Sequence, residues 1–382
     1  MKNGDVSFWF ADMGGLPGYR AALPGDIDVD VCIVGAGFTG LWTAYYLKAA
    51  NPGLSVAIIE KEFAGFGASG RNGGWCSGGF SWNRSKYLSS GTRDGVIGFE
   101  RQLRATVDEV IRVCEAEGID ANIRRTDCLT FACTPAQMER LRAEQADDMA
   151  WDVPESRSHL IGAAEAAARI RVKDVQGALV TGGVARVQPA KLVRGLAEAV
   201  ARKGVAIYEQ TTVTGISKGR VTTHRGTVTA HRIVRATEGF THGIPGNARE
   251  WIPLNSAIVV TEPVPEAMWE ELGWTGYEVF GDASHAYCYA QRTQDNRIAM
   301  GGRGVPYRFG SKTDVNGETQ AETVEKLKDI LYRMLPQTRA LALDHAWCGV
   351  LGVPRDWCTT AGLDPKTGIG WAGGYVGLGV ST

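Results

Sequence analysis

The segment G-A-G-F-T-G at residues 35–40 constrains the fold of this 382-residue chain more than any other feature. An apolar run at 29–34 precedes it and is typical of a buried parallel strand. A helical pattern over 39–50 follows it, and Glu60 closes the next apolar run, at 55–60. A strand, a G-x-G-x-x-G turn, a helix and a second strand ending in an acid predict a βαβ unit.

The three glycines of the turn have separate roles in such a unit. Gly35 permits a tight turn, Gly37 lets the backbone approach a pyrophosphate, and Gly40 lets the helix pack closely on the sheet. The helix N-terminus offers free N–H groups and a partial positive charge to phosphates. Glu60 can accept hydrogen bonds from an adenosine ribose, and an acid there argues against NADP. The pattern therefore predicts a Rossmann-type dinucleotide site, and a tight turn without a ligand is the alternative.

A second glycine-rich segment, G-F-G-A-S-G-R-N-G-G at 65–74, lies just after the second strand. Its many backbone N–H groups and Arg71 are suited to an anion-binding nest. The fingerprint alone does not separate NAD from FAD. An NAD domain normally continues from this strand into a helix without such an insertion, so the loop favours FAD.

Composition argues against several other classes of protein. The net charge is −1, the pI is near 6.6 and no basic run occurs, so nucleic acid and anionic membranes are not expected partners. Mean hydropathy is −0.13, and no apolar run reaches the roughly 18–20 residues of a membrane span. The eight cysteines include no C-x-x-C pair and no zinc-type spacing with histidine, so we expect no metal. Without a signal-peptide layout, a cytoplasmic location is expected.

The two glycine-rich segments, joined by I-I-E-K-E-F-A, resemble the D-amino-acid-oxidase superfamily of FAD-dependent amine oxidoreductases. Within it the chain is most similar to γ-glutamylputrescine oxidase-like enzymes, and more distantly to glycine oxidase and monomeric sarcosine oxidase. The resemblance covers essentially the whole chain and is firmest over 29–80, 184–240 and 345–382. It implies an α/β fold, α+β overall, in which a Rossmann-type FAD-binding domain interleaves with a β-rich substrate domain.

The order of patterns along the chain also predicts two interleaved domains. We expect the FAD-binding domain to comprise 1–90, 160–245 and 340–382, and the substrate domain to comprise 91–159 and 246–339. The C-terminal helix of the FAD-binding domain is expected to be missing, because the sequence stops where that helix should begin.

The resemblance implies FAD contacts at several segments besides the fingerprint. The loop at 65–74 would lie along the flavin and pyrophosphate, the strand at 211–213 beside adenine, and the turn at 236–239 near the pyrophosphate. A C-terminal glycine-rich turn would meet the pyrimidine edge of the flavin. An ordinary strand-end turn is the alternative for Thr237. The candidate cofactor-binding residues are Gly35, Gly37, Phe38, Thr39, Gly40, Glu60, Lys61, Gly67, Ala68, Ser69, Arg71, Asn72, Gly73, Gly74, Val213, Thr237, Gly239, Gly374, Tyr375, Gly377, Gly379 and Val380.

Cys348 is a candidate for a covalent bond to the flavin. It lies six residues before Pro354, and sarcosine oxidases carry the cysteine that joins the flavin 8-methyl group at a similar spacing from a proline. A thiolate beside a flavin is a competent nucleophile. Nearer relatives usually have glycine at this position, and a free thiol on a packed strand is the alternative.

Candidate substrate-pocket residues come from the β-rich middle of the chain. Tyr287, Tyr289 and Arg292 are expected to share one face of a strand, and Arg303 follows in a glycine-rich segment. A guanidinium fork suits a substrate carboxylate, and structural salt bridges are the alternative. We take Tyr289, Arg292 and Arg303 as candidate catalytic residues. Sarcosine-type relatives place an oxygen-activating lysine where this chain has Ala299.

Together these features predict FAD-dependent oxidation of a C–N bond in a small primary or secondary amine. The substrate would be an amino acid, an N-substituted amino acid or a γ-glutamyl-linked amine, with hydride transfer to flavin N5 and hydrolysis of the imine. Reoxidation by O2 would give H2O2. A flavin-binding subunit of a hetero-oligomeric amine dehydrogenase is one alternative, kept open by Ala299. A non-catalytic nucleotide-binding protein is the other, and the oligomeric state is not predicted.

Overall fold

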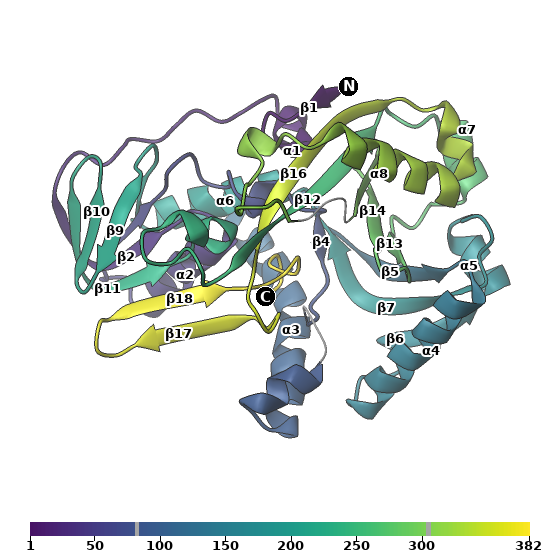
Figure 1. Cartoon of the computed structure of the whole chain (residues 1–382), viewed down its shortest axis with the longest axis horizontal. Helices are drawn as coiled ribbons and strands as arrows, with labels where there is room; N and C mark the ends of the chain where they lie inside the picture. The colour runs from purple at the N-terminus through teal and green to yellow at the C-terminus, as the bar shows by residue number, and fades with distance from the viewer. Residues whose placement is uncertain (81–83, 303–306) are drawn as a thin grey trace.

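Two β-sheets organise the chain, of which the computed structural model describes residues 1–80, 84–302 and 307–382 (Figure 1). The smaller sheet contains β2 (Ile27–Val34), β3 (Val56–Ile59), β8 (Ala206–Tyr208), β9 (Val213–Ser217), β10 (Arg220–Thr223), β11 (Thr227–Arg235), β17 (Thr360–Asp364) and β18 (Ile369–Gly373). Its order is β17-β18-β11-β2-β3-β8, and β10 pairs with β11 and β9. The strands from β18 to β8 run parallel, as a Rossmann-type unit requires.

Both faces of this parallel sheet are covered, which explains why its strands are continuously apolar. Val31 and Ile33 pack on the side of α2 (Phe38–Ala50) and α6 (Pro189–Arg202). Cys32 and Val34 pack on the other side, against apolar residues of β10 and β11. The expected βαβ unit is therefore present as β2, α2 and β3.

The larger sheet contains β1 (Lys2–Asn3), β4 (Trp75–Cys76), β5 (Arg124–Ala132), β6 (Ser158–Gly162), β7 (Gly177–Arg186), β12 (Ile252–Thr261), β13 (Val279–Asp282), β14 (Cys288–Arg292), β15 (Ile298–Gly302) and β16 (Leu343–Val353). Its order is β1-β16-β12-β15-β14-β13-β5-β7-β4, with β6 paired to β7. This sheet supplies the β-rich part of the fold that the sequence predicts.

Helices cover the larger sheet and flank the junction between the two sheets (Figure 1). They are α1 (Phe8–Asp12), α3 (Arg93–Glu117), α4 (Pro135–Ala150), α5 (Ala163–Arg169), α7 (Glu266–Leu272) and α8 (Ala321–Met334). Leu327 and Leu331 of α8 pack with Val259 and Met300 on one face of the sheet. The opposite face packs against the aromatic residues of α1 together with Trp347.

Two long strands of the larger sheet were not expected from the sequence. β7 contains Gly182 and Gly183, and glycine inside a strand pattern signals a break. The structure accommodates Gly183 at φ +66°, beside a register shift between Thr126 and Cys128 of β5. β16 is a single strand of eleven residues despite its two glycines.

The expected domain boundaries remain a prediction. The two sheets do not coincide with them, because strands from segments assigned to one domain pair with strands assigned to the other. β7 and β16 come from segments assigned to the FAD-binding domain, yet both pair within the larger sheet. None of the helices in the described part of the chain combines the length and apolar character that crossing a membrane requires.

Candidate cofactor-binding site

A cavity of about 470 Å³ lies at the carboxyl ends of the parallel strands of the smaller sheet. Its walls come from the segments that follow β2, β3, β8, β11 and β18. Val350 and Leu351 of β16 and the residues Thr313, Asp314 and Asn316 complete the lining. Most of the candidate cofactor-binding residues line it: Gly35, Gly37, Phe38, Thr39, Glu60, Lys61, Gly67, Ala68, Ser69, Asn72, Val213, Thr237, Gly239, Tyr375, Gly377, Gly379 and Val380.

At two of the fingerprint glycines, Gly35 and Gly40, a side chain would clash with the backbone. Gly35 has φ +107°, and a Cβ there would lie 2.5 Å from the carbonyl oxygen of Ala236. A Cβ on Gly40 would lie 2.0 Å from the carbonyl oxygen of Gly35, so this glycine sets how closely α2 approaches the turn. Gly37 is the N-cap residue of α2 and lines the cavity, so its backbone is open to a ligand.

Hydrogen bonds join the loop after β3 to the fingerprint turn and also link residues within the loop. The Ser69 hydroxyl accepts a hydrogen bond from the Phe38 N–H in the first turn of α2, at 2.8 Å. The Asn72 amide donates to the Ser69 carbonyl at 2.8 Å and accepts from the Gly74 N–H at 2.8 Å. These bonds hold the loop as a fixed wall of the cavity.

The Glu60 carboxylate is oriented by two backbone donors at one end of the cavity. It accepts hydrogen bonds from the N–H groups of Ala36 at 2.8 Å and Glu62 at 2.9 Å. Burial raises the pKa of Glu60, while these two bonds oppose the increase. The Lys61 side chain, by contrast, is 69% exposed to solvent. Glu60 is thus a positioned acceptor, as expected of a ribose-binding acid.

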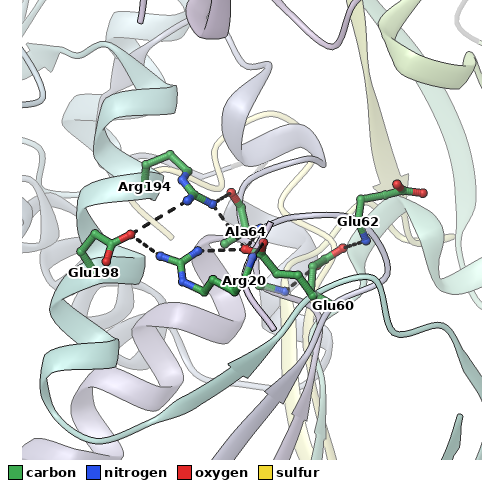
Figure 2. A network of polar contacts seen from close by, with 8 residues as sticks. Arg20, Glu60, Glu62, Ala64, Arg194 and Glu198 are labelled. Carbon is green, nitrogen blue, oxygen red and sulfur yellow. Dashed lines mark hydrogen bonds and ion pairs between the residues drawn. The ribbon is translucent and has the colours of Figure 1, made fainter. Parts of the chain in front are cut away.

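A buried ion network supports the loop that carries Glu60 (Figure 2). The Glu209 side chain is fully buried and accepts from the backbone N–H of Arg20 at 2.7 Å and from its Nη1 at 2.8 Å. It also accepts from the Ala64 N–H at 2.9 Å and from Arg194 Nη1 at 3.4 Å. The network ties the N-terminal segment and α6 to the loop that follows Glu60.

The C-terminal segment closes the cavity from the other side. The Tyr375 hydroxyl contacts the Thr39 hydroxyl at 3.0 Å, which joins the C-terminal turn to the first turn of α2. Gly377 has φ +100°, and a Cβ there would meet no atom within 4 Å. The glycine turn expected at this position is therefore an open part of the cavity wall.

Sequence reasoning missed Glu238, which lines the cavity beside the C-terminal turn. Its carboxylate accepts a hydrogen bond from the Tyr375 N–H at 3.2 Å. A Cβ on Gly352 would lie 2.0 Å from Glu238 Oε2, so the side chain also abuts β16. Burial raises the pKa of Glu238 to about 7. The sequence does contain a signal for this residue, because an acid occupies the variable position of the A-T-x-G turn. From the sequence, only the backbone of that turn was considered, and not this side chain.

We expect Glu238 to make the stability of the protein depend on pH. Its pKa in the folded state lies above the ordinary 4.5, so its contribution to stability is complete below about pH 4.5 and is lost as the pH rises through 7. Between pH 5 and pH 8 the wild type should lose about 2.5 kcal/mol that Glu238→Gln does not lose. Urea unfolding at both pH values measures this difference. The exposed Glu139→Gln serves as control, and equal losses in wild type and Glu238→Gln would contradict the expectation.

Five of the expected cofactor residues lie behind the cavity wall rather than on it: Gly40, Arg71, Gly73, Gly74 and Gly374. Arg71 was expected to contribute to an anion-binding nest, but its side chain is buried and holds the loop to β16. Its Nε donates to the Phe66 carbonyl at 2.6 Å and its Nη1 to the Cys348 carbonyl at 3.3 Å. Gly73 makes room for the Tyr289 ring, since a Cβ there would lie 2.7 Å from it.

The Cys348 side chain lies on the face of the larger sheet that packs against α8, and Cys348 is not among the residues that line the cavity. It donates a hydrogen bond to the Asp314 carboxylate at 3.0 Å and is fully buried. Burial and the Asp314 charge raise the pKa of Cys348, so the thiol stays protonated.

Because the Cys348 thiol is protonated and does not line the cavity, we expect no covalent bond to the flavin. Acid precipitation should release all flavin and leave a colourless pellet. A yellow pellet, absent from Cys348→Ser, would establish the covalent bond instead.

Tyr289 and Arg292, two of the three candidate catalytic residues, are not brought together. Tyr289 and Arg292 were expected to share a face, but they are three positions apart and a strand alternates with period two. Tyr289 packs against Trp75, with ring centroids 6.0 Å apart, and its hydroxyl lies 3.2 Å from that of Ser256. The Arg292 guanidinium instead stacks on Trp269 at 4.0 Å and donates to the Trp274 carbonyl. Tyr287 precedes β14, and Arg303 lies outside the described residues.

The residues of the cavity fit FAD. The open backbone at Gly37 and the first turn of α2 form a cradle for a pyrophosphate. Glu60 provides an acceptor for a ribose at one end, and the turn at 375–380 provides a wall at the other that includes Gly377 and Gly379. Thr211, Thr212 and Val213 line the cavity, consistent with an adenine position.

Known proteins resemble this chain over almost its full length. Gamma-glutamylputrescine oxidoreductase of Escherichia coli is 29% identical over 93% of this chain and 81% of its own. Sarcosine oxidase subunit beta of Rhodobacter capsulatus is 24% identical over 90% and 80%. L-proline dehydrogenase from P. horikoshii has the same fold, with TM-score 0.76, 19% identity and coverage of 94% and 90%. Glycine oxidase of Geobacillus kaustophilus superposes with TM-score 0.75, 21% identity and coverage of 93% and 92%.

A sequence profile of the family described as FAD dependent oxidoreductase matches residues 30–382. That range includes every wall of the cavity, from the fingerprint to the C-terminal turn. The expected superfamily and fold are confirmed. The chain belongs to the FAD dependent oxidoreductase family, and FAD is its cofactor.

Proposed function

We propose that this protein oxidises a C–N bond in a small amine or amino acid. The observation that carries the proposal is the match to gamma-glutamylputrescine oxidoreductase, which extends over 93% of the chain and so includes both sheets. Glycine oxidase and L-proline dehydrogenase, which share the fold, are also named for substrates with such a bond. FAD supplies the hydride acceptor for this chemistry when it is bound.

The side chains next to the cofactor loop are suited to excluding water from such a reaction. Tyr289 and Trp75 pack edge to face beside Gly73, and Trp347 donates its indole N–H to the Arg71 carbonyl at 2.8 Å. Burial raises the pKa of Tyr289 to about 12, so its hydroxyl stays protonated. A neutral, largely apolar wall favours binding of an amine as the free base and keeps water from the reacting bond.

A flavin-binding subunit that passes electrons to another acceptor is a second candidate. Ala299 favours it, because this buried methyl group on β15 provides no cationic side chain for oxygen activation. The similarity to sarcosine oxidase subunit beta favours it as well. Formation of H2O2 and the identity of the electron acceptor are therefore separate parts of the proposal. The cytoplasmic location remains a prediction from the sequence.

One spectroscopic experiment separates these functions. The FAD-loaded protein is mixed anaerobically with a panel of primary and secondary amines, and the flavin absorbance near 450 nm is followed. Bleaching by an amine, with peroxide formed after admission of air, supports an amine oxidase. Bleaching without peroxide supports the electron-transferring subunit. Absence of bleaching with every amine would overturn the proposed function.

A further inference from the structure

Three guanidinium groups surround one aromatic ring at the end of the larger sheet nearest β4. The Tyr277 ring lies 4.0 Å from the Arg124 guanidinium, 4.5 Å from that of Arg292 and 5.3 Å from that of Arg186. Arg186 and Arg292 are buried, whereas Arg124 is exposed. Like charges gathered around one ring repel, so the cluster costs free energy unless an anion compensates it.

No carboxylate among the described residues pairs with any of the three. Glu278, the acid next to Tyr277, pairs with Arg169 at 2.7 Å instead. Arg292 donates to neutral acceptors, the Trp274 carbonyl and the Asn296 side chain. Arg186 is only 1% exposed, and its one described hydrogen bond goes from Nη2 to the Gln294 amide oxygen at 3.0 Å.

Arg186 in particular has unused capacity to bind an anion. Its Nε is buried and has no partner in the described part of the chain. Burial lowers its pKa to about 10, which leaves it charged at neutral pH. A guanidinium that is buried, charged and incompletely paired is suited to a carboxylate ligand, which can accept two parallel hydrogen bonds.

The position of Arg186 links this cluster to the cofactor loop. Arg186 of β7 pairs directly with Trp75 of β4, so their side chains emerge on the same face of the sheet. Trp75 follows Asn72, which lines the cofactor cavity, by three residues. Three residues of chain span at most about 11 Å, so the Trp75 backbone beside Arg186 lies within that distance of the wall. The Trp75 indole N–H is also buried without a described partner.

We propose that Arg186, with Arg124 and Tyr277 beside it, forms a subsite for a carboxylate carried by the amine substrate, remote from the bond that is oxidised. This inference rests on the proposed function. The subsite would select an amine whose carboxylate lies several bonds from the nitrogen, because Arg186 lies beside Trp75, beyond the Asn72 wall of the cofactor cavity. Amines that lack the acidic group would bind beside the flavin without this contact.

The test compares 6-aminohexanoate with hexylamine in the FAD-loaded full chain. Flavin reduction by 6-aminohexanoate is expected to have a kcat/KM at least tenfold higher than reduction by hexylamine. Arg186→Met and Arg124→Met should each lower this value ten- to hundredfold for 6-aminohexanoate through KM, and leave hexylamine unchanged. Arg186→Lys should retain part of the preference.

Arg125→Met is the matched control, because Arg125 is the next residue of β5 and pairs with Asp108 at the surface. It should behave as the wild type toward both amines. Equal kcat/KM values for the two amines in the wild type, or equal losses for both in Arg186→Met, would overturn the subsite and leave amine oxidation standing. Arg124 is exposed, so Arg124→Met keeps the test valid where Arg186→Met does not fold.

Calorimetric titration with hexanoate tests the subsite without turnover. Wild-type protein should bind hexanoate, and Arg186→Met should bind it at least tenfold more weakly, even where no amine bleaches the flavin. Absence of hexanoate binding to the wild type would overturn the subsite whatever the amine panel shows. The failure of the subsite and the failure of amine oxidation are thereby distinguished.

Discussion

Gly37→Val is expected to abolish FAD binding while the fold survives. Gly37 has φ −83° and ψ −173°, which valine adopts without strain, so the backbone tolerates the change. Its Cβ would lie 2.9 Å from the Ser69 hydroxyl oxygen, the end of a side chain that can rotate. The two methyl groups would occupy the space where a pyrophosphate approaches α2. We expect at least a hundredfold loss of FAD affinity, measured by fluorescence titration of the apoprotein.

The matched control for this substitution is Gly162→Val. Gly162 is also a helix N-cap residue, with φ −75° and ψ 172°, and a Cβ there meets no atom within 4 Å. This variant should bind FAD with wild-type affinity. Tight FAD binding by Gly37→Val would mean that the pyrophosphate does not pass over this turn, and a collapsed melting temperature in that variant would mean that the turn is needed for folding.

Arg20→Met is expected to lower the free energy of unfolding by about 3 kcal/mol, because it leaves the Glu209 carboxylate buried without its principal cation. Arg20 provides two of the hydrogen bonds to Glu209, and Arg194 lies farther away, at 3.4 Å. The substitution removes only the bond from Nη1; the bonds from the backbone N–H of residue 20 and from the Ala64 N–H remain and keep part of the carboxylate satisfied. Urea unfolding with the slope held constant measures the loss.

Arg112→Met provides the comparison, because it removes an arginine from an ion pair of similar geometry at the surface. Arg112 and Glu109 are 59% and 37% exposed, and such pairs contribute less than about 1 kcal/mol. The Arg20 variant should also bind FAD more weakly, since the loop that carries Glu60 loses its anchor. Equal destabilisation by the two substitutions would show that the buried network adds nothing beyond a surface pair.

The sequence predicted the cofactor end of the molecule better than the substrate end. A side chain at Gly40 would clash with the backbone of Gly35, and one at Gly35 would clash with Ala236 at the end of the adjoining strand. The spacing of these glycines in the sequence is therefore enough to predict the geometry of the turn. The path of β7 was not predictable, because its glycines are accommodated by a shift in the partner strand. The contact between Glu238 and the Tyr375 N–H joins positions 137 residues apart, and no local pattern encodes it.

Predicting the substrate end required knowing which face of a strand each side chain occupies. The two-residue period of a strand was applied incorrectly there. Arg292 was placed with Tyr289, although the period of a strand puts them on opposite faces. Arg186 was not singled out, since its significance arises only where β5, β7 and the residues before β13 meet. Which arginines lie together without a carboxylate depends on which strands pair in the folded protein. A single sequence does not show that pairing.

The hydroxyl contact between Thr39 and Tyr375 has a consequence for biosynthesis. These residues are 336 positions apart, so a ribosome must have synthesised the chain through Tyr375 before the cavity can close. FAD therefore cannot template the folding of the nascent fingerprint segment before the residues around Tyr375 have been made. The cofactor then stabilises the native state by mass action, and flavin supply during expression should govern how much protein escapes aggregation.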